Sequence, residues 1–303
     1  MPLLLAYLAV ILIWSTTPLA IQWSGQQDWL VGVAGRIFIS ALLIIPILLF
    51  WTRQRFSLKK QDLLIYLAAS LGMLGGMTPM YYAAQTMPSG WVSLLFGLTP
   101  MVTGLFAYFI LHNMALTLSK YLGLLVGFIG LMVVLAPNLS WQTAAGKTLL
   151  TGLGFALLSV TFHSLSTVLV KKLNHGLPNT HIVAGAVWIS SLVYLLLHPQ
   201  FLIELPALPN RALSAIVYLG VFGSLIGFIL YYYVLRHLDA VRLGLITLIT
   251  PIIALLLGHF LNQEPLNATI WTGAGLVILG LVLFEFGHRV SRESFRLLLN
   301  RMF

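Results

Sequence analysis

Two ionisable side chains stand inside long apolar stretches of this sequence and are the first candidates for chemistry. Arg36 lies roughly 9 Å along its predicted helix from Leu30 at 1.5 Å per residue, and its charge could attract a carboxylate, with a structural or gating role as the alternative. His163 lies among serines and threonines, and its imidazole can exchange a proton near neutral pH. It is therefore a candidate proton carrier, unless it is a neutral imidazole bonded to a neighbouring helix. Ionisable groups inside a membrane are functional candidates by default.

Polar and aromatic side chains in other apolar stretches could line a cavity for a solute. Trp188 is a candidate for aromatic binding, with packing as the alternative. Tyrosines near the ends of apolar stretches commonly anchor a helix at the membrane interface. Because two tyrosine pairs, 81–82 and 232–233, recur at one spacing, we expect one member of each pair to line or gate a path. The predicted cavity residues are Trp14, Ser15, Thr16, Arg36, Tyr81, Tyr82, Thr99, His163, Trp188, Tyr232 and Thr250.

A Thr-Pro pair occurs in the middle of two apolar stretches, as Thr99-Pro100 and as Thr250-Pro251. Proline lacks an N–H and crowds the carbonyl four residues earlier, so each pair should interrupt its helix and free a carbonyl group. An unpaired carbonyl in lipid costs several kcal/mol, so the break should face protein or a polar cavity. We predict helix breaks with a gating role at Pro100 and Pro251, against the alternative of kinks that only improve packing.

The two Thr-Pro pairs belong to an internal duplication. An offset of 151 residues, from 99 to 250, also superimposes glycines, tyrosines and a phenylalanine of the two halves: Gly72 on Gly223, Gly76 on Gly227, Tyr81 on Tyr232, Tyr82 on Tyr233 and Phe109 on Phe260. Apolar bias alone would mostly match leucines. The chain is therefore predicted to consist of two similar halves.

Composition places the halves in a bilayer. Of the 303 residues 59% are hydrophobic and 8% are charged, which is too little charge for a water-facing surface. Apolar stretches of about 20 residues, long enough to cross about 30 Å of hydrocarbon, recur with short polar breaks. We predict an all-α integral membrane protein of ten transmembrane helices, at 3–22, 30–51, 63–86, 90–111, 118–137, 150–171, 181–198, 212–235, 241–261 and 269–287.

Loop charge predicts the orientation of the spans. With the N-terminus inside, the 16 lysines and arginines all fall on the cytoplasmic side except Arg36, Lys147 and Arg211. Both termini are thus predicted to be cytoplasmic. Five spans in each half give the halves opposite orientations, so the repeats are inverted, as in transporters that alternate between inward-open and outward-open states. The predicted domains are 1–139, 140–288 and a basic cytoplasmic tail, 289–303, that could lie on the anionic inner leaflet or be disordered.

Other classes of function fit the sequence less well. A multispan enzyme acting on a lipid or prenyl substrate usually needs acidic clusters or paired acid and base groups, and no acidic pair at ligand spacing and no histidine cluster is visible. A channel would not require inverted repeats. We expect no enzyme activity, no metal, no cofactor and no nucleic-acid partner.

The ordered set of motifs resembles the EamA branch of the drug/metabolite transporter (DMT) superfamily. The set comprises Leu12-Ile13-Trp14-Ser15-Thr16-Thr17, the Thr-Pro pairs of spans four and nine, Glu264-Pro265, and the glycine pairs 123/130 and 273/280. The resemblance implies an inner-membrane carrier, often a metabolite or amino-acid exporter, with a cavity lined by helices one to four and six to nine. His112-Asn113-Met114 departs from it, because the family often has a Glu at the place that matches Glu264.

We therefore predict a secondary transporter in a bacterial inner membrane. It would move a small metabolite, an amino acid or a similar amphipathic solute, by alternating access, with export favoured over uptake. Its partners would be the solute, the bilayer and, through His163, a proton as coupling ion. The protein would be a monomer or a weak dimer.

Overall fold

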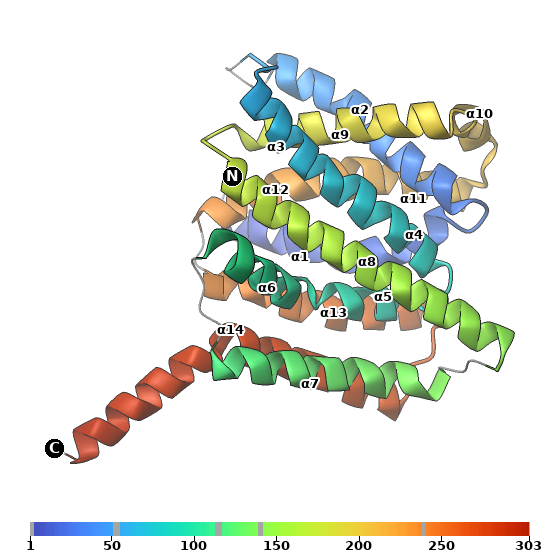
Figure 1. Cartoon of the computed structure of the whole chain (residues 1–303). Coiled ribbons are helices and arrows are strands. Elements are labelled where there is room, and N and C mark those ends of the chain that lie inside the picture. The colour runs from blue at the N-terminus through green and yellow to red at the C-terminus, as the bar shows by residue number, and fades with distance from the viewer. Residues whose placement is uncertain (1–2, 51–54, 113–116, 139–141, 238–239, 303) are drawn as a thin grey trace.

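A computed structural model describes the chain except for residues 1–2, 51–54, 113–116, 139–141, 238–239 and 303, and leaves aside the side chains at 232, 235–236, 240–245 and 288–302 (Figure 1). Within this part every regular element is helical. The first half has α1 (Leu3–Ser24), α2 (Trp29–Phe50), α3 (Lys60–Leu71), η1 (Gly72–Met77), α4 (Thr78–Ala84), α5 (Ser89–Phe96), α6 (Thr99–Leu111), α7 (Leu118–Leu135) and η2 (Ala136–Asn138). The second half has α8 (Ala144–Leu173), α9 (Asn179–Leu197), α10 (Phe201–Glu204), η3 (Leu205–Ala207), α11 (Asn210–Tyr218), η4 (Leu219–Ile226), α12 (Gly227–His237), α13 (Ala240–Asn262) and α14 (Ala268–Met302).

These helices make ten membrane spans. Nine segments of the described chain are long and apolar enough to cross a membrane, and a shorter apolar helix, Ile246–Asn262, supplies the tenth. Span three consists of α3, η1 and α4, span four of α5 and α6, and span eight of α11, η4 and α12. The predicted all-α fold of ten transmembrane helices is confirmed.

Eight of the spans form a closed ring. Span one packs against α13, α13 against α5, span four against α8, and α8 against span three; span three then packs against α9, α9 against α2, α2 against span eight, and span eight against α1. The fifth and tenth spans, α7 and α14, pair with each other beside this ring (Figure 1). The ring contains spans one to four and six to nine, the helices that the family resemblance implies to line a cavity.

The two halves repeat the same backbone irregularities. Spans three and eight each contain a π-helical segment, η1 and η4, around the glycines that the offset of 151 residues superimposes. His112 and Gln263, which are also 151 residues apart, both adopt the left-handed conformation with φ 54° after spans four and nine. Non-glycine residues rarely take this conformation, so a matched pair is strong evidence of duplication. With five spans each, the halves run through the membrane in opposite directions, as predicted.

Glycines allow α7 and α14 to approach through their backbones. A Cβ atom on Gly130 would lie 2.6 Å from the Val277 nitrogen and 2.7 Å from the Gly273 carbonyl oxygen. A Cβ on Gly123 would lie 2.6 Å from the Gly280 carbonyl oxygen. Only residues without a side chain tolerate such proximity, which is the close packing that helices use in lipid. The glycine spacings of the sequence therefore serve contact within one chain.

The two Thr-Pro pairs differ in their effect on the helix. Span four is interrupted between α5 and α6, and Pro100 lies in the first turn of α6, where its missing N–H costs nothing. Helix α13 continues through Pro251, so the break predicted there is wrong. The offset explains the difference: Gly97 precedes the first break, whereas Leu248 occupies the equivalent place in α13. Glycine disfavours a helix by about 1 kcal/mol relative to alanine. The helix of span four is therefore interrupted here, and the helix of span nine is continuous.

Candidate functional site

Arg36 is buried between α2 and the π-helical segment of span eight. Its side chain is 2% exposed, and its Nε donates a hydrogen bond to the Ser224 Oγ at 2.6 Å. Gly223 leaves room for the guanidinium, since a Cβ there would be 3.2 Å from the Arg36 Nη2 atom. Among the described residues this is its only hydrogen bond, and no carboxylate pairs with it. A buried cation is therefore left with most of its hydrogen-bond donors available.

Two tyrosines lie close to this cation. Tyr194 of α9 is within electrostatic range of both Arg36 and Tyr81, and its hydroxyl is 2.6 Å from the Thr78 hydroxyl. Tyr81 is fully buried and accepts a hydrogen bond from the Ser24 Oγ at 3.4 Å. Arg36 and Tyr81 were both predicted. Tyr194 was missed because it has no counterpart at the repeat offset, where Leu43 stands.

The other tyrosine of the first pair, Tyr82, lies on a different surface. Its ring contacts Trp29 at 5.7 Å and Phe155 at 4.6 Å between centroids. With Thr78 and Pro79 these three aromatics line a hollow of about 280 Å³ among α2, α4 and α8. Of this pair, Tyr82 therefore borders the hollow, whereas Tyr81 is fully buried. The side chain of Tyr232 lies outside the described part of the chain.

His163 faces the glycine-lined side of η1. A Cβ on Gly76 would be 3.4 Å from the His163 Cβ and 3.6 Å from its Nδ1, and the imidazole ring meets the Phe96 ring edge-on at 6.0 Å. Neighbouring serines of α8 satisfy backbone carbonyls of the irregular spans. Ser159 donates to the Gly76 carbonyl, and Ser164 donates to the Thr99 carbonyl at 3.3 Å. The break in span four thus faces polar groups of protein, as a break in lipid requires.

The predicted residues of span one face span eight. The Thr16 hydroxyl is 2.5 Å from the Tyr218 hydroxyl, and the Trp14 ring lies against Tyr231 at 4.7 Å. The hydroxyls of Ser15 and Thr99 are buried without a hydrogen-bond partner among the described residues, and Thr250 is buried as well. Ser15 lies in α1, Thr99 in α6 and Thr250 in α13.

Trp188 lies in the wall between α9 and α2. Its indole N–H donates to the Ala41 carbonyl at 2.9 Å, and its ring contacts Phe56 at 4.9 Å. These contacts occupy the polar atom and one ring face. The role of Trp188 in solute binding stays a prediction, and so do the roles of the other predicted cavity residues.

A polar network ties three spans together at the ends of α1, α5 and α13. The buried Glu264 carboxylate accepts hydrogen bonds from the Ser89 and Gly90 backbone nitrogens at 3.0 and 3.2 Å, and from the Asn262 Nδ2 at 3.1 Å. Asn262 Nδ2 also donates to the Gln22 Oε1 at 2.9 Å. A carboxylate at the N-terminus of α5 is stabilised by the free N–H groups and the helix dipole. The network joins the three spans at this end of the ring.

The arrangement defines a class: ten helices in two inverted repeats, with a ring of eight spans around buried polar groups, form a multi-span membrane carrier. The model of the EamA-like transporter family matches residues 1–136 and again residues 150–286. The chain belongs to this family and is a membrane transporter.

Named relatives agree with this assignment. The uncharacterized transporter YoaV of Bacillus subtilis is 26% identical over 94% of this chain and 98% of its own length. The uncharacterized inner membrane transporter YedA of Escherichia coli K12 is 25% identical over 95% of this chain and 92% of its own length. One solved crystal structure shares the fold with a TM-score of 0.65 at 20% identity, covering 94% of this chain and 98% of that one.

Proposed function

We propose that this transporter is a secondary carrier that exports a small amphipathic metabolite with a carboxylate group, such as an amino acid, across a bacterial inner membrane. The observation that carries the proposal is Arg36. Burial of an unpaired charge costs several kcal/mol, and the described residues offset this cost with a single hydroxyl, that of Ser224. A solute carboxylate would supply the missing counter-charge, and the guanidinium fork suits its two oxygens.

The surroundings of Arg36 support an amphipathic solute. Tyr194 lies within electrostatic range of the cation, so a solute held by its carboxylate would have aromatic surface nearby. Arg36 lies seven residues after Trp29, about 10 Å along the helix at 1.5 Å per residue. The charge is therefore well inside the apolar span and away from both loop faces.

Alternating access is supported by the repeats and by the closing network. An inverted pair of similar halves can exchange conformations at similar free energy. The network around Glu264 joins α1, α5 and α13 at the face predicted to be outside, so release on that side requires these contacts to break. His163, next to the π-helical segment of span three, is our candidate for proton coupling. The proposed orientation has both termini in the cytoplasm, and the proposed unit is a monomer or a weak dimer.

Counterflow in proteoliposomes tests the proposal. Vesicles preloaded with a mixture of unlabelled amino acids should accumulate a labelled amino acid, and Arg36→Gln should raise its half-saturation concentration at least tenfold. Arg36→Lys keeps the charge but loses the planar guanidinium, so an intermediate increase in the half-saturation concentration is expected. Ser224→Ala, which removes the neighbouring hydroxyl and keeps the cation, is the matched control. Unchanged half-saturation in a stably folded Arg36→Gln protein would exclude Arg36 as the carboxylate site.

A further inference from the structure

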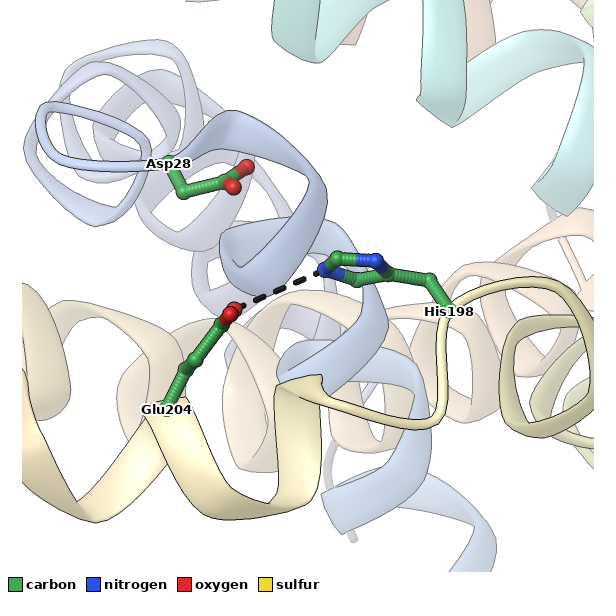
Figure 2. Close-up of side chains that lie close together, drawn as sticks. All are labelled: Asp28, His198 and Glu204. Carbon is green, nitrogen blue, oxygen red and sulfur yellow. Dashed lines mark ion pairs between the residues drawn. The ribbon is translucent and has the colours of Figure 1, made fainter.

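Three metal-binding groups meet at one end of the ring, outside the membrane-spanning segments. Asp28 lies between α1 and α2, His198 follows the last residue of α9, and Glu204 lies in α10; their ligand atoms are all within 4.8 Å of one another. Figure 2 shows the two carboxylates and the imidazole coming together from separate backbone segments. The sequence predicted no metal site, because Asp28 is far from the other two in the chain.

We propose that Asp28, His198 and Glu204 form a site for a divalent transition metal of the zinc class. Imidazole nitrogen and carboxylate oxygen atoms are both ligands that zinc accepts. A nitrogen ligand favours zinc, cobalt or nickel over magnesium and calcium, which prefer oxygen alone. The two carboxylates neutralise the charge of a divalent cation. Solvent can reach the site, since the Glu204 side chain is 46% exposed, so water can complete the coordination.

The distance between the His198 imidazole and the Glu204 carboxylate fits two ligands of one ion better than a direct hydrogen-bonded ion pair. The His198 Nε2 lies 3.5 Å from the Glu204 Oε2. A charge-assisted hydrogen bond would bring these atoms to about 2.7–2.9 Å. Two tetrahedral ligands at about 2.0–2.2 Å from zinc lie roughly 3.3–3.6 Å apart. The His198–Glu204 separation is therefore compatible with two groups that bind the same ion, and all three ligand atoms lie within 4.8 Å of one another.

The donors are held in place by their own backbone contacts. The Asp28 Oδ1 accepts a hydrogen bond from the Leu30 nitrogen at 2.7 Å, which orients the carboxylate and leaves its second oxygen for a ligand. The His198 nitrogen donates to the Tyr194 carbonyl at 2.8 Å, which fixes the residue at the end of α9. The His198 Nε2 is fully buried without a hydrogen-bond partner among the described residues, although its side chain is 21% exposed. A buried imidazole nitrogen without a partner is costly unless a ligand occupies it.

A metal here would join the two repeats. Asp28 belongs to the first half, and His198 and Glu204 belong to the second. The helices that it would clamp, α2 and α9, pack against each other and carry Arg36 and Tyr194. His198 lies four residues, one helical turn, after Tyr194, so occupancy would fix the relative position of the two helices beside the proposed solute site.

Zinc titration of the purified protein tests the proposal without any transport assay. The full chain, freed of its affinity tag and stripped with EDTA, is titrated by calorimetry, and its thermal unfolding is followed with zinc or magnesium. We expect one zinc per chain and a higher unfolding temperature with zinc but not with magnesium. His198→Gln and Glu204→Gln should each weaken binding at least tenfold, the scale of losing a ligand or its support, with unchanged unfolding temperature in EDTA.

His175→Gln provides the matched control. His175 is also surface-accessible, with its side chain 49% exposed, but it pairs with Asp62, away from this site. Its substitution should leave zinc affinity unchanged. Equal zinc affinity of the wild-type and His198→Gln proteins, no zinc stabilisation of the wild type, or equal stabilisation by magnesium would each overturn the site.

Discussion

Replacing Glu264 with glutamine should weaken the contacts that hold α1, α5 and α13 together at one end of the ring. The carboxylate accepts three hydrogen bonds, two of them from the Ser89 and Gly90 nitrogens at the start of α5. Hydrogen bonds to a charged group contribute about 1.5–3 kcal/mol each, and the amide keeps one acceptor oxygen but loses the charge. We therefore expect the closed state to lose about 2 kcal/mol relative to the open state. At 1.4 kcal/mol per factor of ten, the open population should rise about thirtyfold.

A cysteine reporter can measure this shift, because the chain contains no cysteine. Ser93 lies one turn after Ser89 and is 5% exposed, so Ser93→Cys is a conservative reporter that becomes accessible when α5 separates from α13. The rate of reaction with a membrane-impermeant maleimide, added from the outside of right-side-out vesicles, should rise about thirtyfold in the Glu264→Gln background. The control Lys147→Gln removes an exposed charge on the same predicted face, in α8.

Two results would contradict this reasoning. One is a labelling rate in the Glu264→Gln background within twofold of that in the wild-type background. The other is an equal increase with Lys147→Gln, which would trace the effect to surface charge and not to the network. A melting temperature measured on each variant separates gate opening from general unfolding.

Three further predictions concern packing, aromatic contacts and topology. Gly130→Leu should cost at least 1–3 kcal/mol of stability through overlap with the α14 backbone, whereas Gly275→Leu, with nothing within 4 Å of its Cβ position, should be neutral in thermal unfolding. Trp188→Phe should lose about 1 kcal/mol of stability with its hydrogen bond to α2, and unchanged solute affinity would show that the indole packs and does not bind. Single cysteines at 59 and 147, in place of Lys59 and Lys147, should be labelled from opposite sides of the membrane; labelling from one side would refute the predicted orientation.

The architecture was readable from sequence because the constraints of lipid are simple. Each span must be a helix of sufficient length, and the polar breaks between apolar stretches therefore locate the helix ends. The duplication was readable because glycine, proline and tyrosine have conformational or interfacial roles that survive divergence. The left-handed conformations of His112 and Gln263 show that the offset holds even where the residue types differ.

The contacts of single side chains were harder to predict. Arg36 was identified because a charge in an apolar helix is conspicuous, but its hydroxyl partner Ser224 lies 188 residues away and carries no pattern. Symmetry was also over-applied at Pro251, where Leu248 keeps the helix continuous. The convergence of Asp28 with His198 is a matter of long-range geometry alone, which periodicity and spacing do not contain.

The presence of an acid at the Glu264 position in only one half of the chain affects the resting conformation of the solute-free carrier. Two identical halves would spend equal time facing each compartment. Here the second half has Glu264 where the first has Asn113, so under the proposed alternating access we expect the two orientations to differ in free energy. A gap of only 1.4 kcal/mol already gives a ratio of ten to one. If this end stays closed in the solute-free state, an empty carrier would not leak solutes across the membrane. Binding of the solute would then start each transport cycle.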